Sequence, residues 1–120
     1  MSIASDAEFD KESQKDLIMP YLIEGETLKY VFDEKGVGSG FVALTNLRLI
    51  WLDKSFLTKK KVYLTIPYSK IKKIGVEVGG LGKGFFSSSV IEVNDKSFEF
   101  RGAEKATKAY KWIVSHWLES

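Results

Sequence analysis

The apolar residues of this chain recur with two different periods. Between Glu26 and Arg101 they alternate with polar residues, which is typical of β-strands that bury one face. Turn-forming residues divide this stretch, notably Thr45-Asn46 and the pair Asn94-Asp95, which suits a two-residue hairpin. The pattern predicts seven strands, over residues 26–33, 41–44, 47–53, 62–66, 71–78, 85–93 and around 98–100.

The last part of the chain changes to the period of an amphipathic helix. Its apolar residues follow the spacing i, i+3, i+4, i+7, which places them on one face of a helix. They are Ala106, Ala109, Tyr110, Ile113, Val114, Trp117 and Leu118. Seven antiparallel strands that curl into an open barrel leave one end uncovered, and this helix can close it. The expected fold is mainly β with a C-terminal α-helix.

The first part of the chain is expected to be helical. Residues 5–24 are rich in helix-compatible Glu, Lys, Gln and Asp, and Ser5 or Asp6 can cap the N-terminus. Pro20 divides the segment into two pieces, the second of which Gly25 can end. We therefore expect a helical segment over 1–25 and a barrel over 26–120, within a single domain.

Two predicted strands have unusual patterns. The run GFVALTNLRLIWLDKSF, from Gly40 to Phe56, has apolar residues at both odd and even positions. Leu47, Leu49 and Trp51 share one face of the predicted strand, and Arg48, Ile50 and Leu52 share the other. Core on one face and another element or subunit on the other would explain this. Arg48 is then expected to hold a carboxylate, or turn carbonyls beside Asn46. The strand over 71–78 needs one bulge for Ile71, Ile74, Val76 and Val78 to share a face.

These segments carry a family resemblance. The Gly25-Glu26 pair, the run FVALTNLRLIWLDK, the segment LTKKKVYLTIPYSKIKKIGVEVGG and the terminal helix resemble the bacterial pleckstrin-homology (PH) domain families, over roughly residues 22–119. The run LTNLRLIW is also similar to related modules such as GRAM. The resemblance implies a seven-stranded bent barrel capped by the C-terminal helix. Members of one such family assemble into homo-oligomeric rings, and their ligands are largely unassigned.

Charge is unevenly distributed along the chain. Residues 1–34 contain nine acids and three lysines, whereas residues 35–120 contain fifteen bases and seven acids. The acidic segment can fold back on its own basic body or dock on a neighbour. The chain has no cysteine, no apolar run long enough to cross a bilayer and no basic, apolar leader, so we expect a cytoplasmic protein, with peripheral contact to the inner membrane face as an option.

The sequence lacks the residues that most ligand sites require. Phosphoinositide-binding PH relatives carry a Lys on the first strand and a basic pair on the second, and here the corresponding loop offers only Lys35. The glycine-rich runs GVGSG and GGLGKGFF depart from the dinucleotide and phosphate-loop patterns. The single histidine, His116, has no nearby nucleophile in sequence. We expect no enzyme activity, cofactor, metal or nucleic-acid partner.

Two functions remain, and they use different residues. The first is a non-catalytic module that self-associates, possibly as a ring, through sheet edges, Phe85, Phe86 and Trp112. The second is a peripheral module that binds anionic membranes through lysine-rich loops. A protein or peptide partner is compatible with either. The lysines concerned are Lys59, Lys60, Lys61, Lys70, Lys72, Lys73 and Lys83. A simpler interpretation of Phe85 and Phe86 is that one faces the core and the other is partly exposed.

Overall fold

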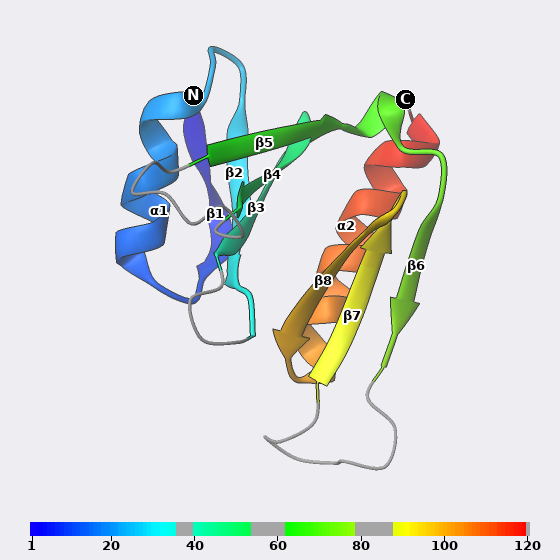
Figure 1. Cartoon of the computed structure of the whole chain (residues 1–120). Coiled ribbons are helices and arrows are strands. Elements are labelled where there is room, and N and C mark those ends of the chain that lie inside the picture. The colour runs from blue at the N-terminus through cyan, green and yellow to red at the C-terminus, as the bar shows by residue number, and fades with distance from the viewer. Residues whose placement is uncertain (36–39, 54–61, 79–87, 120) are drawn as a thin grey trace.

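The fold consists of two β-sheets, a long C-terminal helix and a short N-terminal helix (Figure 1). The structure is a computed structural model that describes residues 1–35, 40–53, 62–78 and 88–119. The elements are β1 (Ser2–Phe9), α1 (Glu12–Ile18), η1 (Met19–Tyr21), β2 (Thr27–Asp33), β3 (Phe41–Thr45), β4 (Arg48–Asp53), β5 (Val62–Pro67), η2 (Tyr68–Lys70), β6 (Ile74–Glu77), β7 (Ser88–Val93), β8 (Lys96–Arg101) and α2 (Ala103–Glu119), where η1 and η2 are 3₁₀ helices.

The strands form one five-stranded and one three-stranded sheet. The first has the order β1-β2-β3-β4-β5 and the second β6-β7-β8, and all neighbours are antiparallel except β1 and β2. The predicted hairpin at Asn94-Asp95 is confirmed: Val93 pairs with Lys96, and Asn94 has a φ of 56°. A hydrogen bond from the Lys35 amide to the Glu99 carbonyl oxygen, 2.7 Å long, links the two sheets. The open-barrel prediction is thus confirmed, with one strand added at the N-terminus.

The central strands of the five-stranded sheet are buried on both faces, as the two-sided apolar pattern of residues 40–56 predicted. Leu49 and Trp51 of β4 join a core between the two sheets and α2, whereas Ile50 and Leu52 join a second core beneath α1 and η1. Both Ile18 at the end of α1 and Leu22 after η1 are buried in that second core. The second face of β4 is therefore covered by the chain's own N-terminal segment.

The N-terminal prediction was wrong in its first half. Residues 2–9 form β1 rather than helix, and α1 begins only at Glu12. Because β1 and β2 are parallel, the chain must cross over between them, and α1 with η1 makes that crossover. Backbone pairing with β2 overrides the helix propensity of residues 5–9. Pro20 lies in the first turn of η1, as expected, but Gly25, with a φ of 83°, turns the chain into β2 instead of capping a helix.

Two strand patterns also needed correction. The expected strand over 71–78 shrinks to β6, because η2 follows Pro67 and places Ile71 before the strand. Ile71 is buried, whereas Val76 and Val78 are exposed, so these residues do not share one face. Leu47 is 42% exposed in the turn before β4 and does not share the buried face of Leu49 and Trp51.

The inward positions of the last hairpin and of α2 agree with the prediction. Phe98 and Phe100 of β8 are buried, and so are Ala106, Ala109 and Ile113 of α2. In Figure 1, α2 runs along β7 and β8, so that its apolar stripe closes the side of the core that the strands leave open. Leu118, at the end of the predicted stripe, is 75% exposed, because the helix extends past the sheet at that point.

At Gly40 the chain passes close to the backbone of β4. This glycine lies just before β3, and a Cβ atom at this position would collide with the carbonyl oxygen of Leu52. Since that atom belongs to the backbone of β4, the collision cannot be relieved by a side-chain rotation. Glycine is therefore required here by space rather than by backbone conformation.

Candidate functional site

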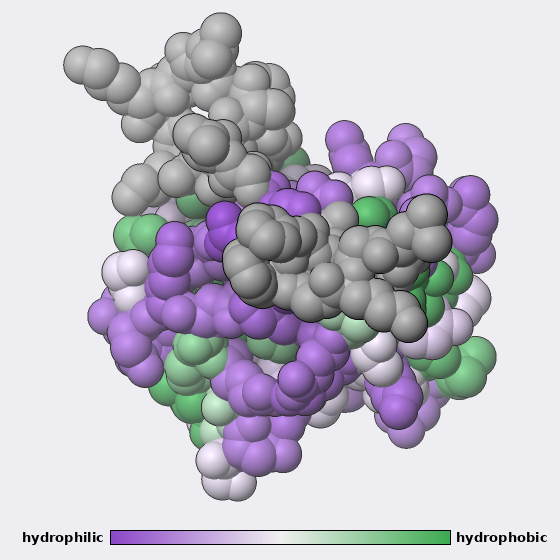
Figure 2. Space-filling view, turned by 90° about the horizontal axis from the view of Figure 1, so that it is seen from below, coloured by the Kyte–Doolittle hydropathy of each residue, from purple (hydrophilic) through white to green (hydrophobic). Residues whose placement is uncertain are grey.

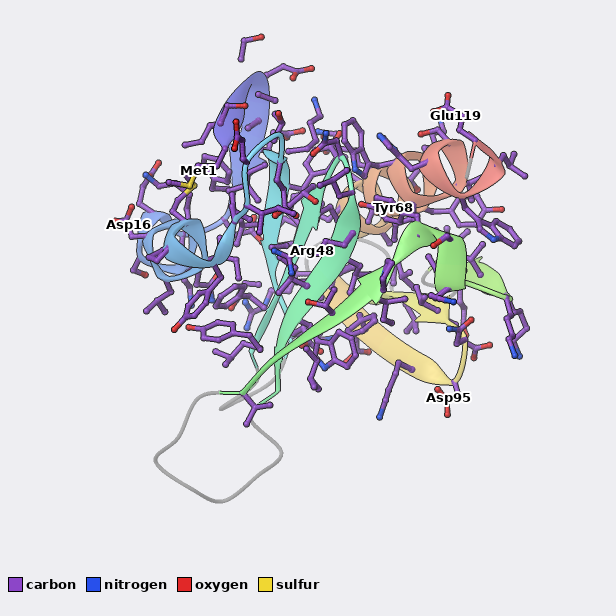
Figure 3. All side chains as sticks on the ribbon, turned by 90° about the horizontal axis from the view of Figure 1, so that it is seen from above. Met1, Asp16, Arg48, Tyr68, Asp95 and Glu119 are labelled. Carbon is purple, nitrogen blue, oxygen red and sulfur yellow. The ribbon has the colours of Figure 1, made fainter. Side chains whose placement is uncertain are left out.

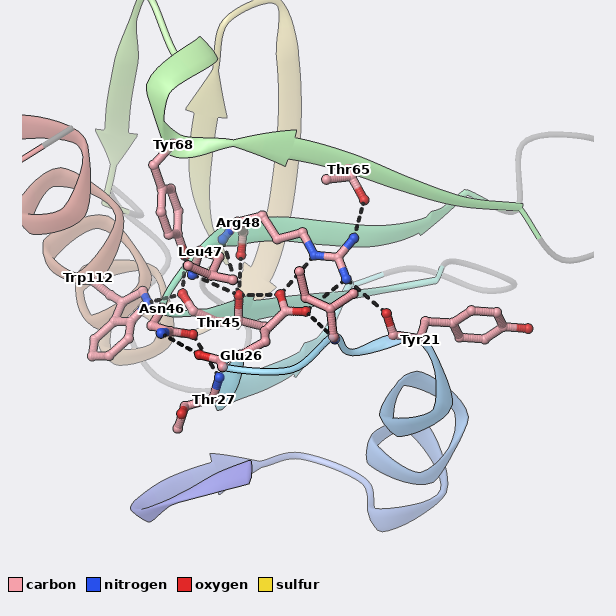
Figure 4. A network of polar contacts seen from close by, with 12 residues as sticks. Tyr21, Glu26, Thr27, Thr45, Asn46, Leu47, Arg48, Thr65, Tyr68 and Trp112 are labelled. Atoms are coloured by element: carbon pink, nitrogen blue, oxygen red, sulfur yellow. Dashed lines mark hydrogen bonds and ion pairs between the residues drawn. The ribbon is translucent and has the colours of Figure 1, made fainter. Parts of the chain in front are cut away.

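The most concentrated polar network of the described residues centres on Glu26 and Arg48 (Figure 4). Glu26 precedes β2 and its side chain is fully buried. Arg48 opens β4 and donates to both carboxylate oxygens: its Nε to Oε2 over 2.8 Å and its Nη2 to Oε1 over 2.9 Å. This bidentate geometry is the strongest form of ion pair between these groups. The expectation that Arg48 holds a carboxylate is confirmed.

The same guanidinium ties further elements together. Arg48 Nη2 also donates to the Tyr21 carbonyl oxygen at 2.9 Å, and Nη1 donates to the Thr65 hydroxyl at 3.1 Å. Asn46 accepts from the Thr27 amide at 2.7 Å and donates to the Gly25 carbonyl oxygen at 3.1 Å. This network around Glu26 and Arg48, called the corner below, therefore connects η1, β2, β4 and β5. The donors of Arg48 are engaged within the fold.

The environment of Glu26 sets its ionisation. Burial pushes the pKa of this carboxyl upward, but hydrogen bonds from Arg48, from the Thr45 hydroxyl at 2.7 Å and from the Ile23 amide at 3.0 Å outweigh it. The pKa of Glu26 consequently lies below its ordinary value, and the group is an anion at neutral pH. A buried anion that is fully paired inside the fold stabilises the corner and offers no free charge to a ligand.

Trp112 was predicted to contribute to a self-association surface, and the structure shows it engaged within the fold. It is half-buried against the core of α2, and its indole Nε1 donates to the Thr45 carbonyl oxygen at 2.9 Å. Tyr68 donates to the same oxygen at 2.6 Å, and burial raises the pKa of its hydroxyl. Trp112 thus joins α2 to the end of β3, and its indole N–H is used within the fold.

His116 lies in the same aromatic group. Its ring centroid is 4.3 Å from that of Trp112 and 5.3 Å from that of Tyr68. Its Nδ1 lies 2.8 Å from the Trp112 carbonyl oxygen, one helical turn back. The Ser115 hydroxyl, 3.3 Å from that nitrogen, also donates to the Trp112 carbonyl oxygen. The polar groups of Ser115 and His116 thus make local contacts within the last turns of α2.

The acidic N-terminal segment lies on the chain's own basic residues. Asp6 meets Lys29 at 2.6 Å, Glu8 meets Lys108 at 2.8 Å, and Asp10 meets Lys105 at 2.9 Å. Of the two arrangements that the charge distribution allowed, the structure shows the acidic segment folded back on its own body. Lys108 also pairs with Glu104, and the hydrogen bonds that its ammonium group donates to Glu8 and Glu104 raise the pKa of that group.

The predicted surface lysines fall into two groups. Lys70, Lys72 and Lys73 are exposed, and hydrogen bonds to Asn94 hold them beside the tip of the β7–β8 hairpin, where Figure 3 labels Asp95. Asn94 fixes this segment: its Oδ1 accepts from the amides of Lys72 and Lys73 at 2.7 and 3.3 Å, and its Nδ2 donates to the Lys70 carbonyl oxygen at 3.3 Å. The remaining predicted residues, Lys59, Lys60, Lys61, Lys83, Phe85 and Phe86, lie outside the described residues.

A family model described as a bacterial PH domain matches residues 1–116. The chain belongs to the bacterial PH domain family. Among solved structures, this PH domain is similar to one from Shewanella amazonensis at 24% identity (TM-score 0.63, covering 91% of this chain and 99% of that one). It is also similar to a DUF1696 family protein from Shewanella loihica at 21% identity (TM-score 0.62; 92% and 96%). A third, a PH domain-containing protein from Exiguobacterium sibiricum, is 21% identical (TM-score 0.55; 88% and 56%).

No curated protein matches the chain. The structural neighbours are too distant in sequence to indicate more than the fold, and PH domains are generally non-catalytic. In the described part of this PH domain, no group of three or more His, Cys, Asp or Glu side chains is placed to hold a metal ion, and no helix is long and apolar enough to span a membrane.

The PH domain also has unpaired sheet edges. Within the described residues, the three-stranded sheet ends at β6, which pairs with β7 on one side only. Val76 is 37% exposed on this strand and Val78, just beyond it, is 52% exposed. Seen from below, the surface is largely polar with apolar patches between the polar side chains (Figure 2). An edge strand with exposed valines is a template for pairing with another chain.

The site residues that sequence reasoning missed are the partners of residues it had noticed. Glu26 was noticed only as part of the Gly25-Glu26 pair, although a lone acid at the start of an apolar strand, with an Arg on a nearby strand, is the signal for a buried ion pair. Asn94 was identified as a turn residue, but its side-chain bonds to residues 70–73 depend on a tertiary contact.

Proposed function

We propose that this protein is a non-catalytic interaction module that self-associates through the edge of its three-stranded sheet. The observation that supports this proposal best is the outer edge of β6, where backbone hydrogen-bonding groups lie beside the exposed side chains of Val76 and Val78. Single exposed apolar residues are common on protein surfaces, but exposed valines in and beside an edge strand favour strand pairing.

The edge is short, and its pairing partner must supply an edge of its own. In the five-stranded sheet, the described residues leave β1 and β5 at the two ends. If β6 of one copy pairs with a different edge of the next, the contact is head-to-tail, and it closes into a ring when the rotation between copies is right. If β6 pairs with β6, the product is a dimer.

The polar residues support a role without catalysis. The strongest cluster, Glu26 with Arg48, is buried and internally paired, and His116 is engaged with the end of α2. These groups stabilise the fold, and because their polar atoms are already engaged there, they are poorly placed to act on a substrate.

The test is the oligomeric state of the wild type and of two variants. Size-exclusion chromatography with light scattering, at several tens of micromolar protein, should give an oligomer for the wild type. Replacing both edge valines, Val76→Lys and Val78→Lys, should give a monomer, because lysines on an edge strand block pairing. Ile23→Lys is the matched control: Ile23 is 57% exposed but lies outside the strands, so this variant should stay oligomeric. A monomeric wild type would refute the proposal.

Contact with anionic membranes is the second candidate. It is supported by the three exposed lysines Lys70, Lys72 and Lys73, whose backbone Asn94 holds in place. Each lysine brought to an anionic surface contributes about 1 kcal/mol, a contribution that salt screens. Flotation with anionic vesicles should recover the wild type at low salt and lose it at high salt or in the variant Lys70→Gln/Lys72→Gln. Recovery that is the same with neutral vesicles would exclude this mechanism.

A further inference from the structure

The N-terminal strand β1 is held to the sheet without any fully buried residue. It pairs with β2 at two places, Ser2–Ile3 and Glu8–Phe9, and the register shifts between them. None of its residues is buried; Ala4, Ala7 and Phe9 are half-buried and the others are exposed. Helix α1, in contrast, is anchored by Ile18, which is fully buried. The strand can therefore leave β2 without exposing a fully buried side chain, at the cost of the contact that half-buried Phe9 makes with the second core.

The surface under β1 is built to receive acidic side chains. Lys29 of β2 is the decisive residue: its side chain is only 10% exposed, and it lies over the rings of Tyr30 and Trp112 at 5.1 and 5.7 Å. Among the described residues, the carboxylate that pairs with this lysine is Asp6 of β1. A nearly buried ammonium group requires an anionic partner, so the position above it selects for an acid.

Two lysines of α2 extend this preference for acidic residues along β1. Lys108 pairs with Glu8 and Lys105 pairs with Asp10, so the acids at 6, 8 and 10 each meet a different lysine. A cavity of about 320 Å³ lies at this end, between the end of β1 and the start of α2, and its lining includes Phe9, Phe32 and Gly102. The site combines a strand edge, three cations and space for an additional side chain.

We propose that the outer edge of β2, together with Lys29, Lys105 and Lys108, is a docking site for an extended acidic segment of a partner protein, and that β1 is its intramolecular occupant. The partner segment adds to the sheet as a parallel strand, with acids at alternate positions facing the three lysines. A segment without the irregularity between Ile3 and Glu8 would pair more continuously than β1 does. This inference is independent of pairing at the β6 edge.

The tether determines how the site behaves. Only Asp10 and Lys11 connect β1 to α1, so β1 competes with any free segment at an effective concentration on the order of millimolar. A free acidic peptide should therefore bind poorly to the wild type and well once β1 is weakened. The variant Asp6→Lys/Glu8→Lys weakens it, because each new lysine faces a lysine that was paired.

The experiment uses the full chain and a fluorescent peptide with the sequence of residues 1–11, followed by fluorescence anisotropy. The Asp6→Lys/Glu8→Lys variant should bind this peptide at least about tenfold more tightly than the wild type does. Adding Lys105→Gln and Lys108→Gln to that variant should weaken binding again. A peptide with its three acids changed to amides should bind weakly, and so should one with prolines at positions 4 and 7, which keeps the charge but cannot form the ladder.

Several results would overturn the proposal. It fails if the wild type and the Asp6→Lys/Glu8→Lys variant bind the acidic peptide equally, or if the amide peptide binds as tightly as the acidic one. Equal binding of the proline peptide would show attraction by charge alone and would also refute strand addition. Hydrogen exchange on the wild type provides a second measurement: the Ser2 and Asp10 amides, which bond to the Glu26 and Val31 carbonyl oxygens, should exchange much faster than the amides between β3 and β4. Equal protection would mean that β1 does not detach.

Discussion

Removing the guanidinium of Arg48 tests the account of the buried corner. The substitution Arg48→Met keeps most of the aliphatic stem and deletes the donors to Glu26, Tyr21 and Thr65. Glu26 then keeps only its hydrogen bonds from the Thr45 hydroxyl and the Ile23 amide. Because the Glu26 side chain has no solvent exposure, water cannot replace the lost partner without opening the corner.

The expected loss of stability is large for a single substitution. Removing one partner of a buried ion pair costs about 3–5 kcal/mol, mostly because the remaining charge is left unpaired. The Arg48 side chain is 21% exposed, which places this pair at the lower end, so the free energy of unfolding at pH 7 should fall by about 3 kcal/mol. Protonation of Glu26 limits the loss, since a neutral carboxyl is less costly to bury.

The loss should depend on pH in a defined direction. In the wild type the pKa of Glu26 lies below its ordinary value of 4.5, so its contribution is complete above that pH and disappears as the pH falls through the folded-state pKa. Without Arg48, burial is the largest remaining influence and should shift the pKa of Glu26 upward, so the penalty should be present at neutral pH and disappear on acidification. The difference in stability between the two proteins should therefore be greatest near neutrality and shrink toward pH 4.

Urea unfolding followed by circular dichroism, at pH 7 and near pH 4.5, measures both quantities. Arg101→Met is the matched control, because Arg101 is 57% exposed and its contact with Asp33 is long, at 3.5 Å; it should change stability by less than about 0.5 kcal/mol. The double variant Arg48→Met/Glu26→Gln should recover part of the loss, since it removes the orphaned charge. An Arg48→Met protein as stable as the Arg101→Met control, or a loss independent of pH, would refute the reasoning.

Substitutions at three further positions probe other parts of the fold, each measured by thermal or urea unfolding. Gly40→Ala should destabilise by several kcal/mol, because the new methyl group meets the Leu52 carbonyl oxygen; a neutral result would show that β3 and β4 can separate there. Asn94→Gly keeps the positive φ but loses the side-chain bonds to residues 70–73, so it should cost about 1–2 kcal/mol, and Asn94→Ala should cost more. Trp112→Phe should cost at least about 1 kcal/mol through its lost bond to Thr45, and an unchanged stability would argue that this bond does not form.

The sequence predicted those parts of the fold in which one local pattern decides the structure. The alternation through β2, β3 and β4, the hairpin at Asn94 and the amphipathic face of α2 each follow from side-chain spacing or turn chemistry alone. The double-sided apolar pattern of β4 also predicted correctly that both of its faces are covered. None of these features depends on knowing which distant segment is the neighbour.

The predictions failed where contact with a segment distant in sequence determines the local structure. Residues 2–9 have a composition that suits a helix, and they form a strand because β2 offers an unpaired edge and Lys29 an unpaired charge. Val76 and Val78 alternate as core residues do, yet they lie exposed at the end of a sheet. Trp112 lies off the apolar stripe of α2, yet it is half-buried, with its indole N–H donating a hydrogen bond to the Thr45 carbonyl oxygen. Local periodicity contains no information about these partners.

The domain uses ion pairs in two physically different ways, and this difference separates its rigid parts from its exchangeable ones. The pair of Glu26 with Arg48 is desolvated and bidentate, so dissolved salt barely reaches it, and it fixes four elements around one carboxylate. The acids at 8 and 10 instead meet lysines whose side chains are about one-third exposed. Salt screens such pairs strongly. Raising the ionic strength should therefore loosen β1 while the corner and both cores stay intact, so that the edge of β2 becomes available without unfolding the domain.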